Sequence, residues 1–157
     1  MVFRYAEVRD ALTAAVRQVA AGRDVAVACS GGLDSGLVAA LAQRDARSVH
    51  LYTCGTADAY NVQMAADLAV RLGLPWTRAA LSPENTAARL EELIAATGNG
   101  DPFTLSYELQ LFCVCREAKE DVVLTGQGAD EYFMGCAKYV GCGDEEYRTL
   151  TQAGVDR

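Results

Sequence analysis

A glycine- and serine-rich segment at 30–35, with the sequence SGGLDS, carries residue types that are suited to holding phosphate. Glycines let a backbone approach phosphate oxygens closely, and the hydroxyl groups of Ser30 and Ser35 can donate hydrogen bonds to them. Asp34 would repel a phosphate unless a divalent cation lay between the two groups, so its carboxylate indicates Mg²⁺. The alternative interpretation is an ordinary strand-to-helix turn that is capped by the Asp and Ser side chains. The segment is not the P-loop of kinases and GTPases, because it lacks the GK pair followed by Ser or Thr.

A second segment, TGQGADE at 125–131, repeats this combination of close glycines and carboxylates. It follows an apolar run, and Asp130 and Glu131 stand behind its two glycines. Asp34 and Asp130 are far apart in sequence, so only the fold could bring them together. Two carboxylates at neighbouring strand ends, facing one cleft, would suit an Mg²⁺-triphosphate site. The alternative interpretation of this segment is a turn followed by a helix cap.

Both segments lie in a chain whose apolar patterns alternate between strand and helix. The short run at 24–29 is almost wholly apolar, which is typical of a fully buried parallel strand. Helices are expected at 5–20, 36–43, 61–72, 82–97 and 104–119, and strands at 24–29, 49–53, 76–81 and 121–124. This alternation predicts an α/β fold, a doubly wound parallel sheet with helices on both faces. Ligands bind outside the carboxyl ends of the strands in such a sheet, which is where both segments begin.

Length and charge set broad limits on the class of protein. With 157 residues the chain is expected to be a single domain, with a core at about 20–140 and a loosely packed, acidic tail at 141–157. The net charge of −7 and the pI near 4.7 argue against a broad basic footprint, so we expect no nucleic-acid partner. A small phosphate ligand is still compatible with this charge, because backbone N–H groups and a metal can hold it.

The sequence also bears on the compartment. No stretch approaches the ~18 consecutive apolar residues of a membrane helix, and the first residues lack the basic start and apolar run of a signal peptide. We therefore expect a cytoplasmic protein with no membrane contact. Six cysteines are then expected to be reduced, buried residues rather than disulfide partners: Cys29, Cys54, Cys113, Cys115, Cys136 and Cys142. Their spacing does not match the CxxC pairs of zinc sites, so a structural metal is not favoured.

Taken together in this order, the two segments resemble the motifs of a known family. SGGLDS after a buried strand is similar to the PP-loop of the N-type ATP pyrophosphatases. The block at 122–135, VVLTGQGADEYFMG, resembles the signature of the asparagine synthetases, usually V-L-S-G-E/D-G-A/S-D-E-L-F-G-G-Y. Asp101 before Pro102, and Gly55 followed by Asp58, also suit the synthetase domain of that family. The resemblance covers about 20–140 and implies the adenine nucleotide alpha hydrolase-like fold.

The resemblance implies a role for each matching residue. Those implied to hold the pyrophosphate part of ATP are Ser30, Gly31, Gly32, Leu33, Asp34 and Ser35. Those implied to line the adenine and ribose pocket are Cys29 with Thr53 or Cys54, and Thr125 and Gly126 from the other side. Asp34 and Asp130 are implied to bind Mg²⁺ and to take part in catalysis. In this family a carboxylate attacks the α-phosphorus of ATP, which gives an acyl-adenylate and pyrophosphate, and ammonia then displaces AMP.

Several positions depart from the family pattern. Members that use glutamine begin with a hydrolase domain whose nucleophile is an N-terminal cysteine, whereas this chain begins Met1-Val2, so we expect no glutaminase domain. Gln127 stands where the signature usually carries an acid, and a neutral amide cannot act as a base. Met134 and Cys136 replace a glycine and an aromatic residue, and nothing shows that Lys138 substitutes for the family's catalytic lysine. These departures bear on amide formation more than on the nucleotide site.

The predicted function is an ATP-dependent carbon–nitrogen ligase of asparagine-synthetase type, which uses ATP and Mg²⁺ to activate an aspartate-like carboxylate for attack by ammonia. One alternative is a nucleotide-binding subunit or regulator without amide synthesis, which Gln127 favours. Another is a different PP-loop enzyme, such as a tRNA-modifying or modified-base synthase, against which the acidic charge counts. A synthetase domain of this length would leave its cleft open on one side, so we expect a homo-oligomer or a partner subunit.

Overall fold

The computed structural model describes residues 5–133, 135, 141–143, 145–146 and 148–149 of the chain. The chain divides into two compact units, Met1–Thr125 and Gly126–Arg157. The first unit contains the segment at 30–35, and the segment at 125–131 begins with its last residue. That both units form one domain, as the length suggests, stays a prediction.

The first unit is built on a four-stranded parallel sheet. Its strands are β1 (Asp24–Ala28), β2 (Ser48–Gly55), β3 (Trp76–Ala80) and β4 (Val122–Thr125), in the order β3-β2-β1-β4. The chain moves outward from β1 through β2 to β3 and then returns to place β4 on the other side of β1. The strand order therefore reverses between β1 and β4, and ligands of doubly wound sheets bind at such a switch point.

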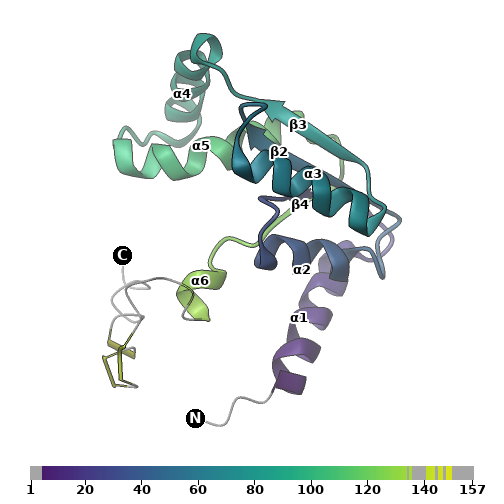
Figure 1. Cartoon of the computed structure of the whole chain (residues 1–157). Coiled ribbons are helices and arrows are strands. Elements are labelled where there is room, and N and C mark those ends of the chain that lie inside the picture. Colours follow the sequence, from purple (N-terminus) through teal and green to yellow (C-terminus); the bar gives the residue numbers. More distant parts are fainter. Residues whose placement is uncertain (1–4, 134, 136–140, 144, 147, 150–157) are drawn as a thin grey trace. The chain divides into compact units, whose positions relative to one another are not determined.

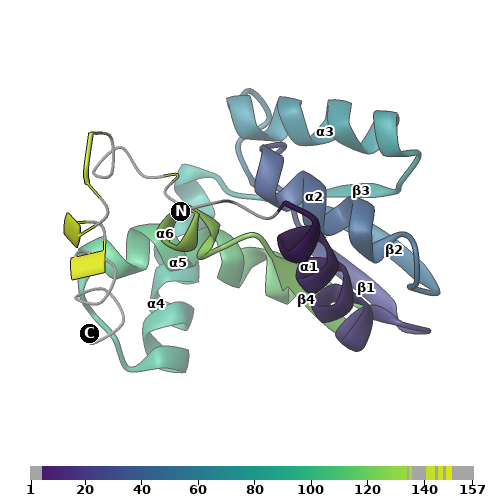
Figure 2. The ribbon, with the colours of Figure 1, turned by 90° about the horizontal axis from the view of Figure 1, so that it is seen from below.

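Helices cover both faces of this sheet (Figure 1). On one face α1 (Tyr5–Ala20), α2 (Leu33–Ala42) and α3 (Tyr60–Leu72) pack against the side chains of Val25 and Val27. On the other face α4 (Pro83–Thr97) and α5 (Pro102–Glu117) pack against Ala26 and its neighbours, as the turned view in Figure 2 also shows. Alternate residues of β1 thus feed two separate apolar cores, and the predicted doubly wound α/β fold is confirmed.

Local capping chemistry sets the starts of α4 and α5, and the starts of α2 and α5 differ from the expected bounds by more than one residue. The backbone N–H of Ser82 donates to Asn85 Oδ1 at 2.8 Å, which caps α4 before Pro83. Asp101 accepts from the Thr104 N–H at 2.8 Å, so α5 begins at Pro102 rather than at Thr104. Helix α2 begins at Leu33, three residues before the expected start, and half of the SGGLDS segment is therefore its first turn.

Some expectations concern the chain as a whole. Cysteines in the described part are all free thiols, and Cys29, Cys54 and Cys113 are buried as expected. The expected burial is wrong for Cys115, which is exposed, and for Cys142, which is half-buried. Cys136, Met134 and Lys138 lie outside the described residues, as does much of the expected tail. Among the residues that the structure describes, no helix combines the length and the apolar character needed to cross a membrane.

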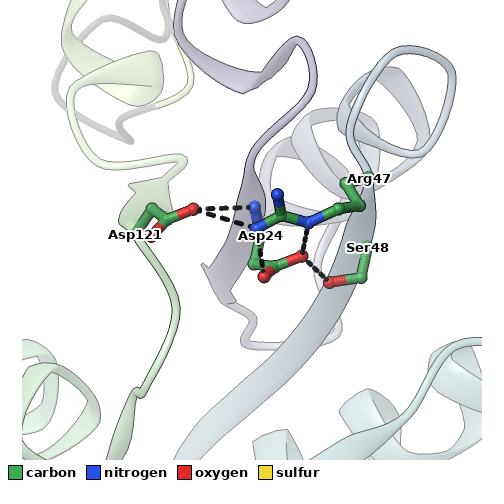
Figure 3. A network of polar contacts seen from close by, with 4 residues as sticks. All are labelled: Asp24, Arg47, Ser48 and Asp121. Atoms are coloured by element: carbon green, nitrogen blue, oxygen red, sulfur yellow. Dashed lines mark hydrogen bonds and ion pairs between the residues drawn. The ribbon is translucent and has the colours of Figure 1, made fainter.

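A polar network joins the strands at their amino ends, opposite the edge where ligands bind (Figure 3). Arg47 Nε donates to Asp24 Oδ1 at 2.8 Å, and Ser48 Oγ donates to the same oxygen at 2.7 Å. Asp121 Oδ2 accepts from the Asp24 N–H at 3.2 Å and lies 3.5 Å from the Arg47 guanidinium. Charges that precede β2 and β4 are thereby joined to the first residue of β1, which aligns three neighbouring strands.

This network predicts a specific dependence of stability on acid. The hydrogen bond from Arg47 lowers the pKa of Asp24 to about 2, with a further contribution from Ser48. Asp24 therefore adds stability above its ordinary pKa of 3.8, and this stability is lost as the pH falls towards 2. We expect Arg47→Ala to be less stable than the wild type at pH 5, with a difference that shrinks towards pH 2. Urea titrations at several pH values measure this, and Arg44→Ala, which removes the same charge from an exposed site, should show no such convergence.

A second prediction concerns alkaline pH and the core beneath α4 and α5. Burial and the nearby Glu120 carboxylate raise the pKa of Tyr52 to about 12, and burial beside Cys113 raises the pKa of Cys54 to about 12. Both groups favour folding while neutral, so their contribution is present below pH 9 and is lost as the pH rises towards 12. We expect urea midpoints to fall across this range, and less steeply in Tyr52→Phe. The exposed ring of α5 provides the control, since Tyr107→Phe should keep the wild-type slope.

Candidate functional site

Three strands lie side by side at the carboxyl edge of the sheet. Ala28, the last residue of β1, pairs with Tyr52 of β2 on one side and with Thr125 of β4 on the other. The chain leaves β1 through Cys29 and enters α2 at Leu33, so the connection is only four residues long. The SGGLDS segment therefore lies at the switch point of the sheet, where doubly wound folds bind their ligands.

The connection is tight because Gly31 lies against the backbone of α3. Gly31 has a φ of +78°, a backbone conformation that residues with a side chain rarely adopt. A Cβ atom built on it would lie 2.5 Å from the carbonyl carbon of Met64 and 2.6 Å from the backbone nitrogen of Ala65. The glycine is thus required twice, by its backbone conformation and by the close approach of a neighbouring helix. The space beside the Gly31 Cα is filled by α3, so a ligand would have to contact other residues of the segment.

The two serines of the segment have different surroundings. Ser35 is buried, with 6% of its surface exposed, and its Oγ accepts from the Ser30 N–H at 3.2 Å. The same hydroxyl lies 3.3 Å from Ser30 Oγ and 3.4 Å from the carbonyl oxygen of Gly32. Ser30 is exposed, and its Oγ also accepts a long hydrogen bond of 3.4 Å from the Gly32 N–H. Ser35 therefore holds the loop together, while Ser30 presents a hydroxyl to solvent.

The first turn of α2 offers backbone donors at the same place. The first N–H groups of a helix have no partner within the helix, and Gly32 at the N-cap supplies no side chain to bind them. Leu33 and Asp34 are exposed in this turn, with 85% of the Leu33 surface accessible. These donors and the positive end of the helix form an arrangement that suits an anion such as phosphate.

The two carboxylates expected to share a metal lie in different units. Asp34 is in the first turn of α2, whereas Asp130 is in the short helix α6 (Ala129–Tyr132) of the second unit. The backbone carbonyl of Asp130 accepts from the Gly135 N–H at 2.9 Å, and a Cβ atom built on Gly135 would collide with the Asp130 carboxylate. Within the described ranges no three His, Cys, Asp or Glu side chains gather closely enough to hold a metal. That both aspartates meet at one Mg²⁺ stays a prediction.

The residues expected to line the adenine and ribose pocket are largely buried. Cys29 and Thr53 each expose 2% of their surface, and Thr53 Oγ1 donates to the Cys29 carbonyl oxygen at 2.6 Å. Cys54 exposes 4% and belongs to the core on the opposite face of the sheet, beside Cys113. Thr125 ends β4 and is exposed, and Gly126 begins the second unit. Any contact of Cys29, Thr53 or Cys54 with a nucleotide would therefore come chiefly from the backbone.

Several residues near the site carry no signal in the sequence. Asn61 Nδ2 donates to the Cys54 carbonyl at 3.3 Å, and an Arg78 guanidinium nitrogen donates to the Gly55 carbonyl at 3.1 Å. Trp76 Nε1 donates to Thr53 Oγ1 at 3.1 Å. Each belongs to a different element from its partner, so spacing along the chain could not reveal the contact.

Known proteins are similar to this chain in sequence and in fold. Residues 7–145 match the family model named Asparagine synthase. Over 118 residues the chain is 33% identical to "Putative asparagine synthetase (glutamine-hydrolyzing) 1" of Methanocaldococcus jannaschii, a match that covers 73% of this chain and 22% of that protein. The chain thus spans only about a fifth of this curated relative.

Solved structures show the same fold at low sequence identity. An NH3-dependent NAD synthetase from Campylobacter jejuni has a TM-score of 0.51 at 18% identity, and the match covers 85% of this chain and 61% of that one. An NMN synthetase from Francisella tularensis has a TM-score of 0.56 at 16% identity, with coverage of 85% and 58%. The family match extends over most of the chain, from α1 through the second motif. By this match the chain belongs to the asparagine synthase family.

Proposed function

We propose that this protein binds ATP with Mg²⁺ and forms an amide from an aspartate-like carboxylate and ammonia, with release of pyrophosphate and AMP. The observation that carries the proposal is the uncapped start of α2 at the switch point of the sheet, inside the SGGLDS segment. A family match over 7–145 supports the same reaction class. Asparagine biosynthesis in the cytoplasm is part of the proposal.

The proposed phosphate site uses groups that the structure leaves accessible. The Ser30 hydroxyl and the first N–H groups of α2 would hold the pyrophosphate part of ATP, with Gly31, Gly32 and Leu33 shaping the loop. These donors would stabilise the negative charge that develops on pyrophosphate as it leaves. There is no lysine in the loop, so oriented backbone dipoles and a metal would have to supply this stabilisation.

Asp34 fits a role as a magnesium ligand. Mg²⁺ takes oxygen ligands and is commonly held by one or two carboxylates together with substrate phosphates. Asp34 is exposed in the turn that offers the phosphate donors, so a metal could lie between its carboxylate and the phosphates. In the proposal Asp130 supplies the second carboxylate, and Thr125 and Gly126 contact the nucleotide. When bound, Mg²⁺ would neutralise phosphate charge during cleavage at the α-phosphorus.

Amide formation is the part of the proposal that depends most on the second motif. Gln127 offers an amide where the signature usually carries an acid, so it can donate and accept hydrogen bonds but cannot remove a proton from ammonium. This observation favours a second candidate function, a nucleotide-binding subunit or regulator that makes no amide. The same nucleotide site serves both candidates.

One assay separates the two candidates. Pyrophosphate release from MgATP is measured with aspartate and with other carboxylates, each in the presence and absence of ammonia, and products are identified by mass spectrometry. Release that requires one carboxylate, with the amide formed only when ammonia is present, is the expected result. Tight MgATP binding with no release for any carboxylate would favour the regulator. Failure to bind ATP would overturn both.

The proposal also includes a homo-oligomer or a partner subunit. Light scattering during size-exclusion chromatography measures the mass in solution, and a mass at least twice the 16.7 kDa of the chain is expected for a homo-oligomer. A monomer that binds ATP but releases no pyrophosphate would direct the search to a partner subunit.

A further inference from the structure

We propose that a hydrogen-bonded relay from Trp76 through Thr53 to Cys29 positions the phosphate loop, which makes Trp76 and Thr53 positioning residues for nucleotide binding. The inference rests on the proposed function in that it takes the 30–35 segment as the phosphate site. It gives a positioning role to Thr53, which the resemblance implies only as a lining residue of the nucleotide pocket, and it adds Trp76, which neither motif contains.

The direction of the relay follows from the chemistry of its groups. An indole N–H only donates, so the 3.1 Å contact makes Thr53 Oγ1 the acceptor from Trp76. The single hydroxyl proton of Thr53 then serves the Cys29 carbonyl oxygen at 2.6 Å. The relay crosses three adjacent strands, from Trp76, the first residue of β3, through Thr53 near the carboxyl end of β2 to the residue after β1.

The relay acts at the first peptide unit of the loop. The last backbone bond that continues the ladder between β1 and β2 here joins the Cys29 N–H to the Tyr52 carbonyl at 2.8 Å. The carbonyl of Cys29 is held by Thr53, and the N–H of Ser30 is held by Ser35 Oγ at 3.2 Å. Because a peptide unit is planar, holding its C=O and its N–H sets the orientation of the whole plane. Two side-chain hydroxyls therefore decide in which direction the chain leaves β1.

Burial makes this arrangement specific. Cys29 and Thr53 each expose only 2% of their surface, so water cannot replace the hydroxyl if it is removed. Loss of the hydroxyl would leave the Trp76 N–H and the Cys29 carbonyl without their partner, and a buried polar group pays a full desolvation penalty. The peptide plane could regain a partner by turning. Any such turn would move the Ser30 hydroxyl and the donors of α2, which follow directly.

The test compares two isosteric variants that each remove one threonine hydroxyl, Thr53→Val and Thr77→Val. Thr53→Val breaks the relay, whereas Thr53→Ser keeps the hydroxyl and serves as the conservative variant. Thr77→Val is the matched control, because Thr77 pairs with Tyr52 in the sheet and its Oγ1 contacts His50 Nε2 at 2.9 Å, away from the loop. Calorimetry measures the affinity for MgATP, and steady-state kinetics separate the KM for ATP from kcat. Hydrogen-exchange mass spectrometry measures the exchange rate of the backbone amides in the 29–36 segment without nucleotide.

We expect Thr53→Val to weaken MgATP binding by about tenfold, mainly through KM, and to speed exchange in the 29–36 segment. Thr53→Ser should stay within about twofold of the wild type in affinity, and Thr77→Val should match it in both measurements. Unchanged exchange and affinity in folded Thr53→Val would overturn the relay. If Thr53→Val does not fold, Trp76→Phe removes only the first bond, and an unchanged affinity and exchange there would also count against it. A wild type that binds no ATP would instead defeat the proposed function, and the exchange comparison would still decide the relay.

Discussion

Replacing Gly31 by alanine is expected to destabilise the protein by about 2–5 kcal/mol and to abolish nucleotide binding. A side chain at its φ of +78° costs roughly 1–2 kcal/mol. The new Cβ would also lie 2.5 Å from the backbone carbon of Met64, and overpacking of this kind costs about 1–3 kcal/mol. Because backbone atoms of α3 cannot rotate out of the way, either the loop or the helix must shift. The Ser30 hydroxyl and the start of α2 would move with the loop.

A matched glycine separates the two costs in this prediction. Gly73, at the end of α3, has a φ of +65° and no atom within 4 Å of a Cβ built on it. Gly73→Ala should therefore lose only about 1 kcal/mol, the cost of the positive φ alone. Urea unfolding followed by circular dichroism measures both variants. Equal losses in the two would show that the close approach between Gly31 and α3 contributes nothing.

The second large effect is expected at Asp34. Asp34→Asn keeps the shape of the side chain and removes its charge, and we expect it to lower MgATP-dependent pyrophosphate release by about 100-fold or more. The physical reason is the loss of a carboxylate ligand to Mg²⁺ beside the phosphates. Asp34 is exposed, so the variant should remain folded, and circular dichroism checks this directly.

A chelator makes the Asp34 prediction diagnostic for the metal. With Mg²⁺ present, Asp34→Asn should bind ATP more weakly than the wild type. With EDTA, it should bind ATP equally well or more tightly, because a negative charge near the phosphates has been removed. Asp67→Asn removes the same charge from an exposed position of α3 and should leave both affinities unchanged. Equal effects of Asp34→Asn with and without the metal would argue against a magnesium ligand at this position.

Much of the fold could be predicted because its strongest signals are local. The apolar run that forms β1, the capped start of α4 and the glycine after α3 each depend on a few neighbouring residues. The main errors were at boundaries, as in α2, which begins at Leu33 rather than at Gly36. Leu33 to Ser35 form the first turn of α2 although no side chain caps it. A pattern of apolar residues carries no information about such an uncapped start. The short helix α6 lies in the segment whose alternative interpretation is a turn followed by a helix cap.

Some features of the candidate site are likewise predictable from the sequence, and others depend on the packing of distant elements. The family, the doubly wound sheet and the position of two motifs after two strands follow from the sequence alone, because they depend on residue type and order. Only the three-dimensional fold shows that Ser35 is buried while Ser30 is exposed, and that Cys54 faces the opposite core. Only it placed Met64 against Gly31 and Trp76 beside Thr53. These contacts join elements distant in the chain, so they arise from packing and leave no periodic trace in the sequence.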